Sequence, residues 1–482
     1  MSIDISPVYS IIYINKCADG KKYHTIPPVQ RAAVWCKAVS VSWEKSSRSS
    51  LLNGCTKSVP VSSAGCSRYS AGLCWKSVSG RRMRQREWYR RELDDHKVFV
   101  SWNEQGTRAF YFSKAPPGQW INVELEQEKH TMQLNGSQIF VEVLCEQGVD
   151  TIFGYPGGAV LNLYDELYKN ADRITHVLTA HEQGASHAAD GYARATGRTG
   201  VVLATSGPGA TNLVTGIATA YMDSVPLVAF TGNVATPGIG KDCFQEAYIE
   251  GITMPITKHN FTVRRVEDLA DTMRAAFRIA QSGRKGPVLV DIPKDVTAAV
   301  CEFEAKQPEP IRTVTTFDAE QVRWAADLIN AAQRPLVYFG GGVRSAASCQ
   351  PLRDLLHKAE IPATHTLMAA GVVPYGDPMN IGMLGMHGCY TSNRAVADCD
   401  VLIAVGTRFS DRVALKPKTF AKNATIIQID IDPSELGKNV EVDLSIVGDA
   451  AYVLQAMLPQ IKEAKHPDWM KMIHEWQAQD YH

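Results

Sequence analysis

The chain has 482 residues, enough for about three domains at roughly 150 residues each. Its 50 basic residues balance its 50 acidic residues, and this argues against a dedicated nucleic-acid binder. No run approaches the ~18 apolar residues that a membrane span needs, so the sequence predicts neither a nucleic-acid nor a membrane partner.

The first 131 residues differ in composition from the rest. They hold 20 Lys and Arg against 11 Asp and Glu, a net charge of +9, so residues 132–482 carry −9. Three explanations remain open for this extension: a disordered basic tail, an organelle transit peptide, or upstream DNA translated from a wrong start codon. We favour the third, because regular patterning begins abruptly at Met132 and because six of the nine Trp lie before it. The six later Cys form no C-x-x-C pair, which indicates reduced thiols in a cytosolic protein rather than disulfides or a zinc site. The expected location is the bacterial cytoplasm, and plastid import is the less favoured alternative.

Beyond Met132, helical and strand patterns alternate. Residues 137–147 and 159–168 are expected to form helices, and residues 151–153 and 175–178 short strands. Continuous apolar runs, typical of buried parallel strands, follow at 201–205, 227–231 and 288–292. This rhythm predicts an α/β domain over residues 132–300, with a doubly wound parallel sheet.

A second α/β series follows a change of composition. Residues 301–316 are rich in Glu, Lys and Pro and are expected to form a linker. Strands are expected at 336–339, 361–364, 401–405 and 426–431, within a second domain of residues 317–463. Residues 464–482, mostly a polar helical stretch, are expected to begin a connection to a further domain. The predicted fold class is therefore α/β, with two doubly wound parallel-sheet domains.

Two motifs of the first domain stand at the carboxyl ends of predicted strands, where open α/β sheets bind ligands. Glu182, in His181-Glu182-Gln183, could hold a proton near neutral pH if its surroundings are apolar. It could equally be a helix N-terminal acid stabilised by the helix dipole. The Gly-rich stretch 206–212 allows close backbone approach to a ligand, or is simply a tight strand-to-helix turn.

Three further motifs end strands of the second domain. Residues 340–342 are three glycines, which would suit a dinucleotide pyrophosphate, although the full G-x-G-x-x-G fingerprint is absent. Arg408 and Arg412 suit an anionic cofactor or form a surface ion-pair cluster. Asp430 and Asp432 could take ribose hydroxyls, while Asp432 could instead cap the next helix.

The order of these motifs is more specific than any one of them. From Met132 to the end, the chain resembles the large subunits of acetohydroxyacid synthases (acetolactate synthases), which are thiamine-diphosphate enzymes. The resemblance rests on motifs that occur in this order: residues 153–158, 181–183, 206–212, 244–246, 257–260, 283–284, 291–295, 340–342, 384–388, 408–412 and 430–432.

The resemblance implies roles in the first domain, which would bind the pyrimidine ring of thiamine diphosphate. In this family pyruvate loses carbon dioxide, and the two-carbon unit is transferred to pyruvate or 2-oxobutyrate, an early step of branched-chain amino-acid biosynthesis. Glu182 matches the glutamate that bonds the aminopyrimidine, and Gln245 matches a glutamine near the reacting carbon. The remaining implied residues are Tyr155, Pro208 and Asn212 near the cofactor, and Phe244 and Lys258 in the substrate channel.

The second domain is expected by resemblance to bind FAD in a structural role. Ser410 replaces an aspartate of the family's Arg-Phe-Asp-Asp-Arg signature, and Asn233 stands where a glutamine is usual. The residues that match the surroundings of FAD are Arg284, Gly340, Gly341, Gly342, Thr366, Leu367, Met368, Leu384, Gly385, Met386, His387, Gly388, Gly406, Arg408, Asp411, Arg412, Asp430, Ile431 and Asp432.

The resemblance also implies partners and a missing part. The family continues into a third domain whose Gly-Asp-Gly motif and later Asn bind Mg²⁺ on the diphosphate, so no metal ligands are expected here and little activity is expected from this chain alone. A homodimer or tetramer and a small regulatory subunit are the implied protein partners. Two alternatives remain open: another thiamine-diphosphate enzyme of 2-oxoacids, such as a pyruvate oxidase, glyoxylate carboligase or decarboxylase, or an inactive nucleotide-binding fragment.

Overall fold

The computed structural model describes residues 131–311 and 313–480, and in the first 130 residues only short strands. Those strands form a two-stranded sheet and a five-stranded antiparallel sheet in the order β3-β4-β5-β6-β7. The remainder of this part, and with it the prediction for residues 1–131, lies outside the described residues. The strands are β1 Ile12–Ile14, β2 Tyr23–Thr25, β3 Cys66–Tyr69, β4 Trp88–Leu93, β5 His96–Asn103, β6 Gly106–Phe112 and β7 Ile121–Val123.

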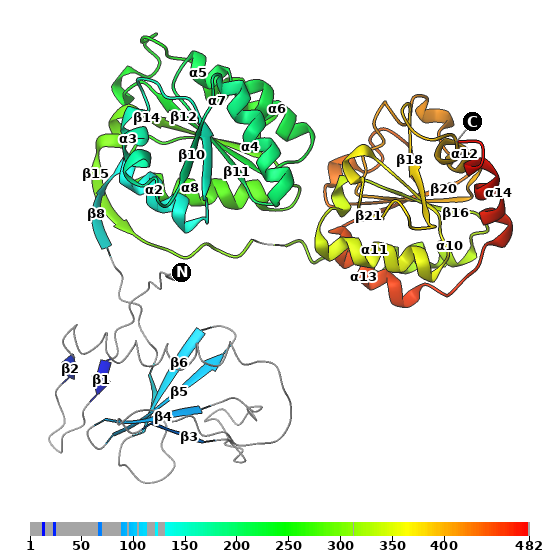
Figure 1. The fold of residues 1–482 in the computed structure, drawn as a ribbon, viewed down its shortest axis with the longest axis horizontal. Coiled ribbons are helices and arrows are strands. Elements are labelled where there is room, and N and C mark those ends of the chain that lie inside the picture. The colour runs from blue at the N-terminus through cyan, green and yellow to red at the C-terminus, as the bar shows by residue number, and fades with distance from the viewer. Residues whose placement is uncertain are drawn as a thin grey trace. The chain divides into compact units, whose positions relative to one another are not determined.

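The first α/β domain is built on a parallel sheet of six strands in the order β10-β9-β11-β12-β14-β13 (Figure 1). All seven residues of the central strand β12 are buried, as expected for a parallel strand covered on both faces. All strands run the same way, so their carboxyl ends share one edge of the sheet. The strands are β9 Thr151–Gly154, β10 Thr175–Leu178, β11 Gly200–Ala204, β12 Leu227–Asn233, β13 His259–Thr262 and β14 Pro287–Pro293.

Helices cover both faces of this sheet (Figure 1). Side chains of β11 alternate between two apolar clusters: Val201 and Leu203 pack on one face, and Val202 and Ala204 on the other. The first cluster includes α2 Gly136–Glu146, α3 Leu161–Lys169, α8 Val266–Gln281 and α9 Lys294–Ala298. The second includes α4 Glu182–Thr196, α5 Pro208–Thr211, α6 Val214–Met222 and α7 Ile249–Thr253.

A short antiparallel pair ties the two ends of the first domain together. Strand β8 (Thr131–Asn135) pairs with β15 (Val300–Glu304), in a register that joins Asn135 to Val300. The sequence predicted a linker over residues 301–316, but its first four residues belong to β15. They are drawn into the domain because Phe303 is buried in its core.

The second α/β domain repeats the plan with the order β18-β17-β16-β19-β20-β21, again all parallel. The strands are β16 Pro335–Phe339, β17 Ala363–His365, β18 Asn380–Met383, β19 Val401–Val405, β20 Thr425–Asp430 and β21 Leu444–Val447. Helices α10 Ala319–Ala331, α11 Ala346–Lys358 and α13 Ala450–Met457 pack on one face, and α12 Tyr390–Asp398 and α14 Pro467–Gln477 on the other.

The prediction of two parallel-sheet α/β domains is confirmed. Every strand expected from the sequence is present, with ends shifted by one or two residues. Three strands of these sheets, β13, β18 and β21, were not predicted. Within the part of the chain that the structure describes, none of the helices combines the length and apolarity needed to cross a bilayer.

Candidate functional site

Glu182 is the first residue of α4, at the carboxyl edge of the first sheet, and its neighbour His181 caps that helix by accepting a hydrogen bond from the Gln183 N–H. The Glu182 side chain is only 8% exposed. Its Oε2 accepts a hydrogen bond of 2.9 Å from Asn212 Nδ2. Its Oε1 accepts no hydrogen bond from any residue in the described ranges, so one oxygen of a buried carboxyl group remains available to a ligand.

The Gly-rich turn after β11 lies directly against this carboxyl group. A Cβ placed on Gly209 would come within 3.3 Å of Glu182 Oε1, and Gly207, with a φ of +58°, leaves no room for a side chain next to the Gln245 backbone. Pro208 is the first residue of the short helix that follows and leads to Asn212. The structure therefore brings Glu182, Asn212, the 207–209 turn and Gln245 together at one edge.

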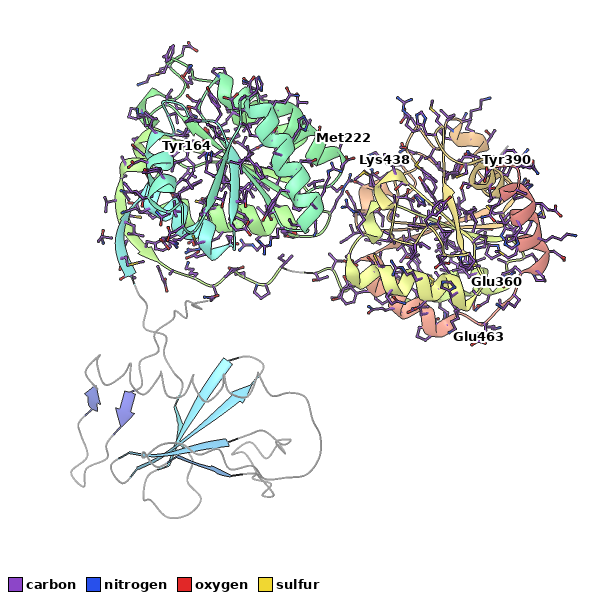
Figure 2. The ribbon with its side chains drawn as sticks, in the orientation of Figure 1. Tyr164, Met222, Glu360, Tyr390, Lys438 and Glu463 are labelled. Carbon is purple, nitrogen blue, oxygen red and sulfur yellow. The ribbon has the colours of Figure 1, made fainter. Side chains whose placement is uncertain are left out.

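The surroundings of Glu182 are poorly hydrated on the side of α3. Tyr164, labelled in Figure 2, is a residue of that helix, and its hydroxyl lies 3.5 Å from the Leu203 carbonyl oxygen. Burial raises the pKa of Tyr164, and the negative charge of Glu182 raises it further. A carboxylate in such surroundings interacts more strongly with a bound cation or hydrogen-bond donor than it would in water.

Two other predicted residues stand at the rim of this edge. Tyr155 follows β9, donates its backbone N–H to the Leu203 carbonyl at 3.3 Å, and is exposed. Phe244 precedes Gln245 and is 87% exposed. Both side chains are thus available to a ligand or to another protein surface.

Lys258 is not brought together with Phe244. It precedes β13, and its backbone N–H bonds the Pro287 carbonyl at the start of β14, so it lies at the amino edge of the sheet. Its Nζ donates to the carbonyl of Ser282 at 2.6 Å, beyond the end of α8. Burial lowers the pKa of Lys258 to about 8. Lys258 therefore lies at the opposite edge of the sheet from Glu182 and Phe244, and its predicted role in the substrate channel stays a prediction.

The sequence reading missed a buried acid beside this site. Asp291 of β14 is 1% exposed, and its Oδ1 accepts a hydrogen bond of 2.6 Å from Thr231. Its Oδ2 accepts from Asn233, whose own Oδ1 accepts the Val234 N–H at 2.7 Å. Burial raises the pKa of Asp291 to about 7, although both side-chain donors oppose the rise. Residues 291–295 belong to the motifs of the family resemblance, but the sequence does not show which side chains hydrogen-bond a carboxyl group inside an apolar strand.

Apart from Arg284, which belongs to the first domain, the residues predicted to surround FAD lie along one edge of the second sheet. They occupy the loops after β16, β17, β18, β19 and β20, which are the carboxyl ends of five neighbouring strands. Backbone hydrogen bonds join adjacent loops, from the Gly342 N–H to the Gly406 carbonyl at 3.1 Å and from the Met386 N–H to the Arg412 carbonyl at 2.9 Å. The structure thus brings these loops together in the arrangement that a long ligand at this edge requires.

This edge has a shape and an unpaired group that suit a ligand. A Cβ on Gly342 would lie 2.7 Å from Gly406 Cα, so glycine is required where the two loops touch. A Cβ on Gly341 would make only an ordinary van der Waals contact with Met368, at 3.5 Å, and the residue is exposed. The Thr366 hydroxyl is buried and has no hydrogen-bond partner among the residues that the structure describes. A nucleotide bound along the glycines could supply that partner.

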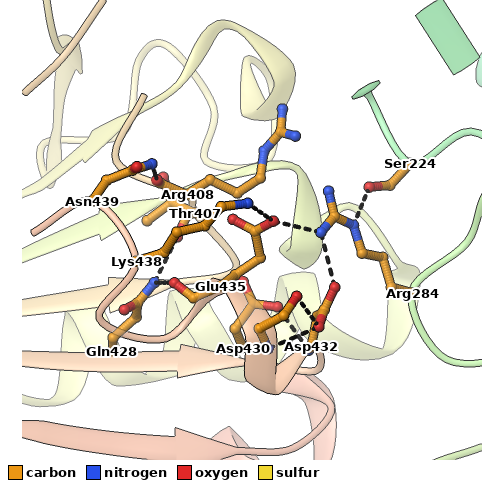
Figure 3. Close-up of polar contacts among 11 residues, drawn as sticks. Ser224, Arg284, Thr407, Arg408, Gln428, Asp430, Asp432, Glu435, Lys438 and Asn439 are labelled. Carbon is orange, nitrogen blue, oxygen red and sulfur yellow. Dashed lines mark hydrogen bonds and ion pairs between the residues drawn. The ribbon is translucent and has the colours of Figure 1, made fainter. Parts of the chain in front are cut away.

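An ion-pair cluster closes one end of the edge (Figure 3). Arg284 Nη1 donates to Asp432 Oδ2 at 2.9 Å and to Glu435 Oε1 at 2.7 Å, and its Nε donates to Ser224 Oγ at 2.9 Å. Burial raises the pKa of Asp430 to about 6, against a hydrogen bond from the Asp432 N–H and the charge of Arg284. Glu435 is buried and was not among the predicted residues. In the sequence it follows Asp432 closely, where an acid is most simply interpreted as an ordinary residue of the first turn of a helix.

The loop that contains Arg408 and Arg412 is more exposed to solvent than the Arg284 cluster. Asp411 and Arg412 are exposed and lie 3.9 Å apart, which makes only a weak ion pair. The Arg408 carbonyl accepts a hydrogen bond of 2.9 Å from Asn439. Ser410, the departure from the family signature, is exposed, and its backbone carbonyl accepts the N–H groups of Val413 and Ala414. These two bonds involve only the backbone of residue 410 and not its side chain.

Two family models match the two α/β domains. Residues 134–252 match the thiamine pyrophosphate enzyme N-terminal TPP binding domain, and residues 322–457 match the thiamine pyrophosphate enzyme central domain. The Glu182 edge lies in the first match, and the loops at the edge of the second sheet lie in the second.

The curated relatives of this chain are named as acetolactate synthases or their large subunits. The chain is 48% identical over 352 residues to the probable acetolactate synthase large subunit of Methanocaldococcus jannaschii, covering 71% of this chain and 59% of that protein. It is 50% identical over 347 residues to the acetolactate synthase of Mycobacterium bovis (71% and 56%) and 45% identical over 357 residues to the acetolactate synthase isozyme 3 large subunit of Escherichia coli (72% and 62%). The chain therefore spans less than two thirds of the length of these relatives. It belongs to the thiamine pyrophosphate enzymes, in the family of the acetolactate synthase large subunits.

Proposed function

We propose that this chain supplies the pyrimidine-binding half of a thiamine-diphosphate site in an acetolactate synthase large subunit. The observation that carries the proposal is the Glu182 carboxyl group. It is buried, held by Asn212 through one oxygen, and free at the other oxygen beside the Gly207–Gly209 turn. A nitrogen atom of the pyrimidine ring could share a hydrogen bond with this free oxygen.

The roles of the chain's own residues follow from this geometry. Glu182 would hold a proton between its free oxygen and the ring nitrogen, while Asn212 fixes the orientation of the carboxyl group. Gln245, whose backbone packs on Gly207, would stand on the reacting side of the ring. When bound, thiamine diphosphate would supply the nucleophilic carbon for decarboxylating a 2-oxoacid such as pyruvate. The turn glycines leave the space in which that ring would lie.

The second domain is proposed to bind FAD in a structural role. The support is the buried Thr366 hydroxyl, which lacks a partner among the described residues, the exposed Gly341, and the acids Asp430 and Asp432 at the end of β20. In this proposal the residues named for the two domains do not bind Mg²⁺ or the diphosphate group of thiamine diphosphate. By analogy with the relatives' printed names, a small regulatory subunit is the proposed partner of a homo-oligomeric large subunit, with 2-oxobutyrate as a second acceptor substrate.

The test measures binding of thiamine diphosphate to the full chain by calorimetry, for the wild type and for Glu182→Gln. A second titration uses an analogue in which carbon replaces the ring nitrogen. The proposal predicts that Glu182→Gln weakens binding of thiamine diphosphate about tenfold or more, since a hydrogen bond to a charged group contributes roughly 1.5–3 kcal/mol. Binding of the carbon analogue should change little.

Glu267→Gln is the matched control, because Glu267 is also a first-turn helix acid but lies on α8, and it should leave both affinities unchanged. Equal affinity of wild type and Glu182→Gln for thiamine diphosphate would refute the assignment. Acetolactate formation from pyruvate, thiamine diphosphate, Mg²⁺ and FAD then tests the activity itself.

A further inference from the structure

The segment 234–246, called here the Gln245 loop, connects β12 to the region before α7. It ends in Phe244, Gln245 and Glu246, next to the Gly207–Gly209 turn. Gln245 has a φ of 57°, and Asp242 a φ of 54°. Residues with a Cβ rarely adopt this left-handed conformation, so other contacts must hold the loop in place.

The Glu246 side chain provides those contacts. Its Oε2 accepts the Cys243 N–H at 2.9 Å, and its Oε1 accepts the Gly240 N–H. The Glu246 N–H in turn donates to the Cys243 carbonyl at 2.9 Å. These bonds close a ring of backbone directly before Gln245. The backbone donors lower the pKa of Glu246, so the carboxylate is ionised at neutral pH.

The base and the tip of the loop are fixed by separate contacts. Near the base, Asp295 accepts hydrogen bonds from the Thr236 N–H at 2.9 Å and the Thr236 hydroxyl at 3.0 Å. At the tip, a Cβ on Gly207 would lie 2.6 Å from the Gln245 carbonyl oxygen, which shows how closely the two backbones pack. The ring of hydrogen bonds made by Glu246 lies between the base and the tip of the loop. It fixes the direction in which the backbone leaves the loop.

We propose that Glu246 is a positioning residue, which holds Gln245 in its left-handed conformation against the turn beside Glu182. The purpose of placing Gln245 beside Glu182 rests on the proposed function. The contacts by which Glu246 holds the loop, called here the clamp, are independent of that function. The competing view is that Glu246 is an ordinary surface acid whose contacts do not constrain Gln245.

The first experiment compares hydrogen exchange of the loop in the wild-type chain, in Glu246→Gln and in the control Glu267→Gln. Glu246→Gln replaces one acceptor oxygen by an NH2 group and removes the charge from the other, so one of the two bonds from backbone N–H groups is lost and the second is weakened. Exchange at Gly240 and Cys243 should become faster, about tenfold or more where the bond is lost. Alkylation of Cys243, followed by mass spectrometry, should also become faster. Glu267→Gln should match the wild type in both measurements. Unchanged exchange and alkylation in a folded Glu246→Gln chain would overturn the proposal.

A second variant separates positioning from general loop stability. Glycine adopts the left-handed conformation freely, so Gln245→Gly removes the strain that the clamp opposes. The proposal predicts that Glu246→Gln accelerates exchange less in the Gln245→Gly background than in the wild-type background. Equal accelerations in the two backgrounds would mean that Glu246 does not act through Gln245.

Titration with thiamine diphosphate connects the clamp to the site. Glu246→Gln should weaken binding, while Glu267→Gln should not. If the wild-type chain binds no thiamine diphosphate, the proposed function fails at its first step, and the exchange measurements still decide whether Glu246 holds Gln245.

Discussion

Asp291 makes the stability of the first domain depend on pH. Its pKa is raised from an ordinary 3.8 to about 7, mainly because the carboxyl group is buried. The unfolded chain therefore releases this proton near pH 4, and the folded chain retains it to about pH 7. Between these values unfolding releases a proton, so stability falls as pH rises and then levels off above pH 7. At 1.36 kcal/mol per pKa unit, the total fall is about 4 kcal/mol.

Thr231→Val is the perturbation that isolates this group. Valine keeps the volume of the side chain but removes the hydroxyl that donates to Asp291 at 2.6 Å. Above pH 7 the lost bond is to a carboxylate and should cost roughly 1.5–3 kcal/mol, whereas near pH 5 it is to a neutral acid and should cost about 1 kcal/mol. The variant should therefore be more strongly destabilised at pH 8 than at pH 5.

Hydrogen exchange of the β12 and β14 amides, corrected for the intrinsic effect of pH, reports on this domain by itself. Thr364→Val is the matched control, because the buried Thr364 hydroxyl donates at 2.8 Å to a neutral acceptor, the Gly382 carbonyl. The cost of Thr364→Val, measured at the β16 and β17 amides of its own domain, should be the same at both pH values. A cost of Thr231→Val that does not grow with pH would refute the reasoning about Asp291.

Three further predictions concern other buried polar groups. Arg284→Met and Glu435→Gln should be coupled in thermal unfolding by about 1–3 kcal/mol, because the two side chains share a 2.7 Å bond and Glu435 is buried; additive effects would contradict this. Thr366→Val should leave stability unchanged or raise it by about 1 kcal/mol, because the hydroxyl has no partner, yet lower flavin retention measured by absorbance; the control Thr364→Val should destabilise instead. Burial lowers the pKa of Lys258 from 10.5 to about 8, so the unfolded chain binds more protons between these values and stability should rise with pH there. Lys258→Met should flatten that rise in urea unfolding, and an unchanged slope would count against it.

The sequence predicted the interior of each sheet better than its edges. The central runs at 201–205, 227–231 and 401–405 are continuously apolar because both faces of those strands are covered, and short apolar runs of this length are typical of buried parallel strands. The three unpredicted strands, β13, β18 and β21, are all edge strands. An edge strand has one neighbour and partial exposure, so its residues need not be apolar, as the His-Asn-Phe-Thr sequence of β13 shows.

The missed strand β13 also explains the placement of Lys258. Without that strand, nothing in the sequence indicated that Lys258 precedes a strand and so belongs to the amino edge of the sheet. Glu182 could be located because it follows a strand that was predicted and begins a helix. The contacts of Asp291 and Glu435 could not be predicted, because their partners come from segments 58 and 151 residues away.

The two edges differ in the groups that hydrogen-bond or pair with their acids, and this difference bears on the ligands proposed for them. At the edge of the first sheet, Glu182, Glu246, Asp291 and Asp295 accept hydrogen bonds only from amides, hydroxyls and backbone N–H groups, and within the described ranges none forms an ion pair. At the second edge, the carboxylates are paired with Arg284. Apart from Asp291, which retains its proton to about pH 7, the acids of the first edge have no cation among the described residues to neutralise them, which would favour a cationic ring such as the thiazolium of thiamine. The second edge presents glycines and arginines, which would suit a pyrophosphate. On this reasoning, added salt should weaken thiamine diphosphate less than thiamine itself, because repulsion of the diphosphate by the first edge is screened along with attraction of the ring.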